Sequence, residues 1–208
     1  MMRSMRLIVG LMSLALVAAC SGGRSAGQTA ALNTRPSAPI TPSIAASATP
    51  TEPLTTGPGV KPGEKPPELD ARGTQHTDEG ALYFAGYFVQ ALDWSIATND
   101  ATLIRHLGLS SCSTCNTYIA KLDSFQRGKN GHVSGGRISI TSERLVHGSS
   151  SITADEIAQF TLLQEPDVVY RPSSAPSTDA STLSTEVRRV YVSWIDLSWK
   201  VVEMAGNG

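Results

Sequence analysis

The chain has 208 residues and a formal net charge of −1, so it carries no basic surplus of the kind that holds a protein to nucleic acid or to acidic lipids. We therefore expect no nucleic-acid partner. Three cysteines, an odd number, predict that one of them has a role outside an intramolecular disulfide.

Residues 1–19 have the layout of a secretory signal peptide. Arg3 and Arg6 precede an apolar run over residues 7–17, and Ala18 and Ala19 follow it. That run is about half as long as the roughly twenty residues that a helix needs to cross a bilayer. We therefore expect it to be removed rather than to remain as a membrane span.

Residues 16–20, Leu-Val-Ala-Ala-Cys, resemble the bacterial lipobox. The resemblance implies that Cys20 receives diacylglycerol through its thiol and becomes the first residue of the mature chain. The protein would then be held by its acyl chains on the outer side of the cell membrane. The alternative is an ordinary signal peptide followed by an incidental cysteine. If Cys20 is lipidated, Cys112 and Cys115 remain as an even pair, which we expect to be oxidised outside the cytoplasm.

Residues 20–66 consist mostly of Ser, Thr, Ala, Pro and Gly, with few charges and no apolar periodicity. Such a composition buries too little surface to offset the entropy lost on ordering. We predict a disordered linker whose ends lie on the order of 40 Å apart. Residues 67–208 are predicted to form one compact domain with its own core.

Three helices are predicted in the first half of this domain. Thr77 caps a helix that continues to about Ala97 with apolar residues on one face. A turn over residues 98–100 precedes a short helix over residues 101–107, which Gly108 ends in a left-handed conformation. Ser110 and Ser111 then cap a third helix, which begins at residue 112 and stops at residue 128.

The second half changes to the two-residue alternation of strands. Strands are predicted over residues 137–141, 158–162, 187–194 and 199–203, with a hairpin turn over residues 195–198. Residues 172–184 are predicted to form a polar loop. The fold class is therefore α+β, with three N-terminal helices packed on a curved antiparallel sheet of about four strands.

This order of elements is similar to the cone-shaped fold of nuclear transport factor 2 and the SnoaL-like proteins. More specific signals are the runs Glu-Gly-Ala at 79–81, Thr-Asn-Asp at 98–100 and Cys-Ser-Thr-Cys at 112–115. Together with the lipobox and the linker, they resemble a family of uncharacterised actinobacterial lipoproteins that carry a single domain of unknown function. Asn99 stands where such sequences commonly have Gly. The resemblance implies a location and a fold, and it implies no chemistry.

The pair Cys112 and Cys115 has the spacing of thiol–disulfide oxidoreductases, in which a helix amino end lowers the pKa of the first thiol. We prefer a structural disulfide that locks the first turn of the third helix, because the pair follows another helix rather than the first strand of a βαβ unit. A zinc site would need further ligands, for which His106 and His132 are the nearest candidates. Their spacing matches no common zinc motif, so we predict no metal and no cofactor.

Two sets of side chains are candidates for a pocket. The aromatic candidates for the core or for a pocket are Tyr87, Trp94, Phe160, Trp194 and Trp199. Most aromatic residues are expected in the core under the sheet, and a minority at the mouth of a pocket. General acids or bases of a cone-fold enzyme would come from Asp93, Asp100, His106, His132 and His147. No two of these have a spacing that predicts a catalytic dyad.

These observations favour a non-catalytic binding or interaction module anchored to the cell membrane. Its partner would be a cell-envelope protein or a small ligand. Analogy with cone folds adds a homodimer as a further expectation. The alternatives are a cone-fold envelope enzyme of isomerase or hydrolase type, and a thiol–disulfide oxidoreductase that uses Cys112 and Cys115.

Overall fold

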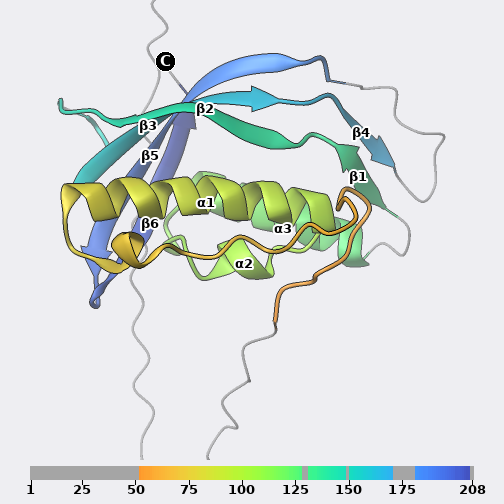
Figure 1. Cartoon of the computed structure of the whole chain (residues 1–208), viewed down its shortest axis with the longest axis horizontal. Coiled ribbons are helices and arrows are strands. Elements are labelled where there is room, and N and C mark those ends of the chain that lie inside the picture. Colours follow the sequence, from red (N-terminus) through yellow and green to blue (C-terminus); the bar gives the residue numbers. More distant parts are fainter. Residues whose placement is uncertain (1–51, 128–130, 149, 171–180, 207–208) are drawn as a thin grey trace, which may run out of the picture. The chain divides into compact units, whose positions relative to one another are not determined.

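The computed structural model describes residues 52–127, 131–148, 150–170 and 181–206. The predicted signal peptide, Cys20 and most of the predicted linker lie outside these residues, as does most of the predicted loop over 172–184. The described part is a mixed α+β structure with antiparallel sheets, as predicted from the change of periodicity (Figure 1). None of its helices is long and apolar enough to cross a membrane.

Helix α1 (Asp78–Thr98) has the boundaries that its sequence predicts. The hydroxyl of Thr77 accepts a hydrogen bond of 3.0 Å from the N–H of Gly80, which satisfies one of the free donors at the helix start. Asn99 ends the helix in the left-handed region at φ 54°, a conformation that Asn tolerates better than most residues. Local sequence therefore sets both ends of this helix.

Helix α2 (Thr102–Arg105) is shorter than predicted, and the predicted role of Gly108 as its left-handed stop is wrong. Gly108 instead lies against the disulfide, where a Cβ atom would come within 2.8 Å of Cys115 Sγ. The next residue, Leu109, donates its N–H to the carbonyl of Val201. Close packing rather than backbone conformation therefore requires glycine at position 108. Helix α3 (Ser113–Arg127) follows.

The larger sheet has the strand order β2-β3-β5-β6, and all its neighbouring strands are antiparallel. The strands are β2 (Ile138–Leu145), β3 (Glu156–Gln164), β5 (Ser184–Ile195) and β6 (Ser198–Gly206). All four were predicted, and each is longer than its alternation suggested. The predicted hairpin turn is confirmed, with Asp196 and Leu197 both at positive φ.

A second sheet of two strands was not predicted. It pairs β1 (His132–Gly135) with β4 (Asp167–Tyr170). Each strand has four residues, which is too short for alternation to distinguish a strand from a loop.

Helix α1 crosses beneath the larger sheet and supplies much of the core (Figure 1). Phe88 of the helix and Phe160 of β3 are buried together with Val190 and Val201 of the two C-terminal strands. Burial of each large apolar side chain contributes about 2 kcal/mol. The core therefore joins the first helix to the last strand.

The segment that we name the N-terminal strap, residues 54–70, runs along α1 (Figure 1). Its part up to residue 66 was predicted as disordered linker, yet the indole N–H of Trp94 donates to the carbonyl of Leu54 at 3.0 Å, and the N–H of Gly59 donates to the carbonyl of Ala97 at 2.8 Å. Gly57 allows this approach, since a Cβ there would lie 2.3 Å from Thr98 Cα. These hydrogen bonds use backbone atoms of the strap. Such bonds do not require apolar side chains at regular spacing, so the sequence of the strap shows no apolar periodicity.

Candidate functional site

The space between α1, α3 and the core face of the larger sheet is almost filled by side chains. Two small spaces of about 20 and 70 Å³ remain there, and both are lined by Tyr118 and Gln164. Glu186 and Arg188, which also line the smaller one, form an ion pair with each other. Ligand pockets are usually at least about 300 Å³ in volume. Neither of these two spaces therefore has room for an organic ligand.

The larger spaces lie on the surface beside α1. A hollow of about 470 Å³ lies between the strap, α1 and β2, and a second of about 280 Å³ continues it toward the start of the helix. Both are lined by Gln90, so we treat them as one and name them the edge groove. Its floor is a stripe of α1 formed by the half-buried Tyr83 and Tyr87, the buried Gly86 and the exposed Gln90.

Arg137 fixes the geometry of one end of the edge groove. Its guanidinium donates to both carboxylate oxygens of Asp93 on α1, with the shortest contact at 2.7 Å, and also to Glu64 and the carbonyl of Gly59 in the strap. These hydrogen bonds, those to Asp93 foremost, raise the pKa of Arg137 above its ordinary value. One side chain thus joins the strap, the first helix and the beginning of β2.

The opposite wall of the groove is β2, an edge strand of the larger sheet. In an antiparallel pair, the backbone groups of alternate residues point away from the partner strand. Ile138 is such a residue, because its N–H donates to Asp93 Oδ1 at 2.7 Å. Ile140 lines the groove two residues further along, before the register shift that separates it from Ser142. The free edge of β2 therefore faces the groove at Ile140.

The other end of the groove is acidic and aromatic. Glu68, Asp70 and Glu143 line it together with Tyr83 and Tyr87. Asp70 pairs with Arg72, and these hydrogen bonds lower the pKa of Asp70 to about 2. Among the described residues, neither Glu68 nor Glu143 has an ion-pair partner.

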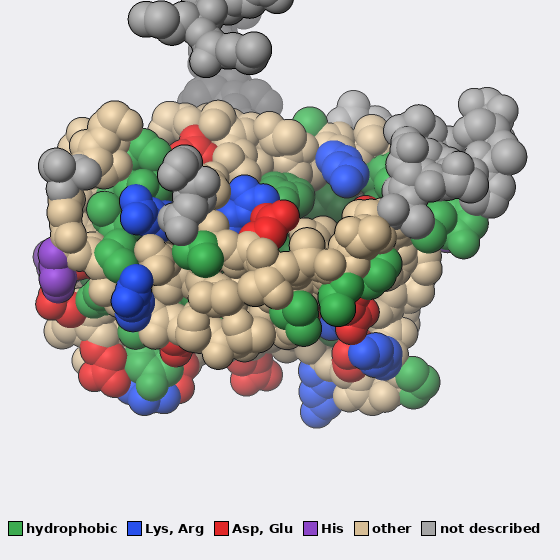
Figure 2. All heavy atoms as spheres, turned by 90° about the horizontal axis from the view of Figure 1, so that it is seen from above, with side chains coloured by type: hydrophobic (Ala, Val, Ile, Leu, Met, Phe, Trp, Pro, Cys, Tyr) green, Lys and Arg blue, Asp and Glu red, His purple; other side chains and the backbone are tan. Residues whose placement is uncertain are grey.

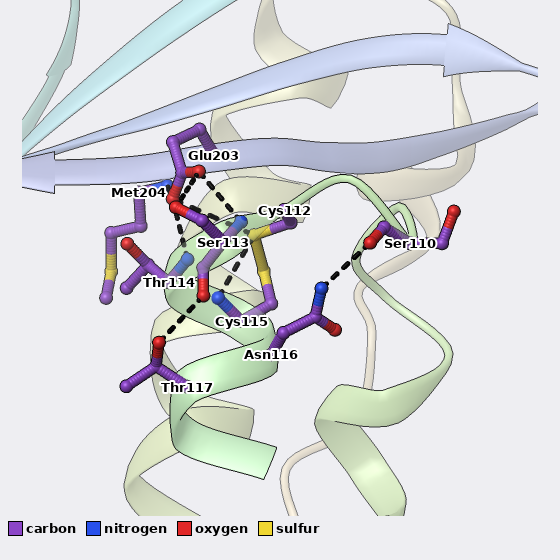
Figure 3. The surroundings of a disulfide bond; sticks show 9 residues. All are labelled: Ser110, Cys112, Ser113, Thr114, Cys115, Asn116, Thr117, Glu203 and Met204. Carbon is purple, nitrogen blue, oxygen red and sulfur yellow. Dashed lines mark hydrogen bonds between the residues drawn. A yellow bond between two sulfur atoms is a disulfide. The ribbon is translucent and has the colours of Figure 1, made fainter. Parts of the chain in front are cut away.

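A second candidate site is the start of α3, where Cys112 and Cys115 form a disulfide (Figure 3). The predicted caps Ser110 and Ser111 do not supply the N-terminal acceptor. The carboxylate of Glu203, 90 residues away along the chain, accepts hydrogen bonds from the N–H of Ser113 at 2.9 Å and from the N–H of Thr114 at 3.0 Å. A residue of the last strand therefore caps the third helix.

The surroundings of the disulfide favour a structural role. The exposed fractions of Cys112 and Cys115 are 0% and 2%, so neither sulfur is open to a substrate thiol. Glu203 Oε1 lies 4.0 Å from Cys112 Sγ. Burial raises the pKa of Glu203, but the hydrogen bonds from Thr114, Ser113 and the Met204 N–H outweigh it and bring the pKa to about 2. A carboxylate so close would disfavour the thiolate that redox catalysis requires.

The predicted aromatic candidates separate into core and surface residues. Trp94, Phe160 and Trp199 are buried in the core. Trp194 is half-buried and stacks on His76 with their ring centroids 4.7 Å apart. Tyr87 and Trp94 line the edge groove, whereas Phe160, Trp194 and Trp199 do not. Of the predicted acid–base candidates, Asp93 also lines it, while the other charged residues of its walls were missed.

The structure brings together two of the predicted acid–base candidates, Asp100 and His132, which line a surface hollow of about 450 Å³ at the end of α1. Asp93 binds Arg137, and Asp100 accepts hydrogen bonds from Thr102 and from the N–H of Leu54. His132 stacks on Tyr170, with their ring centroids 4.5 Å apart. His106 and His147 are exposed, at the C-cap of α2 and after β2. Within the described residues, no three His, Cys, Asp or Glu side chains are placed to hold a metal ion.

The face of the molecule on the sheet side is mixed in character. Figure 2 shows hydrophobic side chains there as separate spots between polar and charged ones. The outward-facing residues of the central strands include the polar Gln159, Thr161, Thr185 and Arg189 and the apolar Ile157, Leu163 and Val187.

Residues 63–205 match the model of a protein family described as "Family of unknown function (DUF6318)", and the chain belongs to this family. No curated protein matches the chain. A solved structure described as the intermembrane space region of the chloroplast protein ARC6 is similar over 64% of this chain and 97% of that chain, with 8% sequence identity and a TM-score of 0.46.

Proposed function

We propose that this member of the family is a lipoprotein anchored to the outer side of the cell membrane, and that its domain is a non-catalytic interaction module. The observation that carries the second part is the contrast between interior and surface. The described interior leaves spaces of about 20 and 70 Å³, whereas the edge groove has a hollow of about 470 Å³ walled by charged side chains and a strand edge. We assign partner binding to this groove.

The anchor is proposed from the sequence, since Cys20 follows an apolar segment and two alanines. Two or three acyl chains hold a protein firmly in a bilayer, because each buried CH₂ contributes about 0.8 kcal/mol. The Cys20→Ala chain is expected to leave the membrane fraction and to lose labelling by a fatty-acid analogue. Retention of that variant in washed membranes would refute the anchor.

We also propose that the domain is a relative of the nuclear transport factor 2 and SnoaL-like cone fold. The support is the order of three helices followed by the four-stranded antiparallel sheet. Between the helices and the sheet of this domain, Tyr118, Gln164, Glu186 and Arg188 line a space of only about 20 Å³. A filled interior favours the interaction module over an isomerase or hydrolase.

A crosslinking experiment in intact host cells tests the assignment to the groove. A photoreactive residue is placed at Gln90 on the groove floor, and at Thr185 on the outer face of the sheet as a matched exposed control. We expect a discrete crosslinked species from position 90 and none from position 185. The opposite pattern, or equal adducts from both positions, would show that the partner binds elsewhere.

A further inference from the structure

We propose that the edge groove binds an extended peptide segment that carries arginine or lysine side chains. The main chain of the segment would pair with the free edge of β2, and a cationic side chain would lie between Glu68, Tyr87 and Glu143. This inference names the partner chemistry of the groove, and it rests on the proposed interaction function.

The strand edge provides the main-chain part of this recognition. β2 has a hydrogen-bonded neighbour on one side only, and its N–H at Ile138 already finds an acceptor in Asp93 across the groove. The groups of Ile140 face the same way and border the hollow. An added strand satisfies such groups, as in other proteins that bind peptides by extending a sheet.

The charge of the groove selects the side chains of the peptide. Lining residues include the acids Glu64, Glu68, Asp70, Asp93 and Glu143, against the bases Lys65 and Arg137. Arg137 is fully engaged by Asp93 and Glu64, and Asp70 by Arg72. Glu68 and Glu143 remain as acids without a paired cation among the described residues, so the groove complements a basic segment.

The chain itself contains an example of the contact that we propose. The guanidinium of Arg72 lies 3.7 Å above the centre of the Tyr83 ring and pairs with Asp70 at 2.9 Å. Tyr87 stands about one turn further along α1 and lines the same hollow as Glu68 and Glu143. This end of the groove therefore presents an aromatic ring and carboxylates to an external cation. Arg72 contacts the same combination of groups.

The length of the groove limits the segment to a few residues. From Tyr83 to Asp93 the floor helix rises about 15 Å, at about 1.5 Å per residue. An extended strand covers that distance with about five residues. Gly86 lies between Tyr83 and Asp93, and a Cβ atom there would be in ordinary van der Waals contact with the Glu143 carboxylate, at 3.5 Å.

The probe for the test is the blocked hexapeptide Thr-Arg-Val-Arg-Val-Thr, titrated by calorimetry into the mature chain carrying Cys20→Ala. Two control peptides separate the contributions. One replaces both arginines by citrulline, which keeps their shape and removes the charge, and the other carries N-methyl groups on alternate amides, which prevents strand pairing. We expect each control to bind about tenfold more weakly than the arginine peptide. This factor corresponds to a loss of about 1.4 kcal/mol of binding free energy.

Protein variants locate the site. The double variant Glu68→Gln with Glu143→Gln should weaken the arginine peptide about tenfold, since it loses two charge-assisted contacts. Glu165→Gln, an exposed change outside the groove, should leave binding unchanged. Equal binding of the arginine and citrulline peptides, equal binding by the double variant, or no binding of the arginine peptide would overturn the proposal. If any of these occurs while Gln90 still crosslinks a partner, the interaction function stands and only the basic-peptide chemistry is wrong.

Discussion

At the residue scale, Glu203 shows how a side chain distant in sequence can fix the start of a helix. It caps α3 through the N–H groups of Ser113 and Thr114 (Figure 3). A carboxylate at this place is stabilised both by the free N–H donors and by the positive end of the helix dipole. No local sequence pattern could reveal this cap, because Glu203 lies 90 residues after Ser113 along the chain.

Replacement of this carboxylate should show itself in the pH dependence of stability. Glu203→Gln is expected to cost about 1 to 2 kcal/mol at pH 7, because it loses the charge in hydrogen bonds to two N–H groups. The pKa of Glu203 is lowered from 4.5 to about 2 in the folded chain, so the folded state binds its proton less readily than the unfolded state. The stabilisation is therefore complete above about pH 5 and is lost as the pH falls toward 2.

Urea unfolding of both chains between pH 2 and pH 7 measures this difference. The curves of wild type and Glu203→Gln should converge at the acid end of that range. Glu165→Gln serves as the control, because Glu165 is exposed and caps no helix. A constant gap across the whole range would mean that the carboxylate charge is not the stabilising factor.

At the scale of elements, Arg137 joins three segments that are distant in sequence. Arg137→Leu should lower the free energy of unfolding by about 3 kcal/mol, since it leaves the half-buried Asp93 without its cation. Arg137→Lys should lose less, because lysine keeps the charge but not the planar set of donors. Arg72→Leu removes a more exposed pair and should cost less than Arg137→Leu. Denaturation with urea measures the free energy of unfolding of all three variants. If Arg137→Leu costs no more than Arg72→Leu, Arg137 does not hold the three segments together.

The elements that local sequence determines were predicted well. Thr77 and Asn99 bound α1 as expected, and the four strands of the larger sheet were found from their alternation. The errors arose where a distant residue decides the local structure. Gly108 faces a disulfide rather than a left-handed turn, and Glu203 replaces the expected serine caps. The two four-residue strands carry too few residues for a periodic signal.

For the candidate site, the sequence named three residues that line the groove, Tyr87, Asp93 and Trp94, and it named the cysteine pair, but it did not indicate the groove itself. Its walls come from the strap, from α1 and from β2, so Glu68, Tyr87 and Glu143 meet only after the chain has folded. None of these residue types is unusual by itself, and exposed acids normally indicate solvation. The sequence feature that could have indicated the groove is Arg137, an isolated arginine before a strand. The partners of Arg137 cannot be assigned without the fold.

At the scale of the whole molecule, the strap places the start of the stable domain before the predicted boundary at residue 67. A chain that begins at residue 52 should be as stable as the mature chain. A chain that begins at residue 67 loses the hydrogen bonds of Leu54 to Trp94 and Asp100, and those of Arg137 to the strap. These hydrogen bonds attach the strap at three residues of the domain, Trp94, Asp100 and Arg137. At about 1 kcal/mol for each residue, the shorter chain should be less stable by about 3 kcal/mol.

Unfolding in urea compares the three chains under one set of conditions. The chain that begins at residue 67 should have a lower midpoint with an unchanged or slightly smaller slope, because the slope scales with the surface exposed on unfolding and only a short segment is removed. A fourth chain, which begins at residue 52 and carries Gly57→Val, provides the matched test of packing. Its Cβ would lie 2.3 Å from Thr98 Cα, so the strap should be displaced and stability should fall toward that of the shortest chain. Equal midpoints for the chains that begin at 52 and 67 would show that the strap contributes nothing to the domain, and the groove it walls would then lose one of its sides.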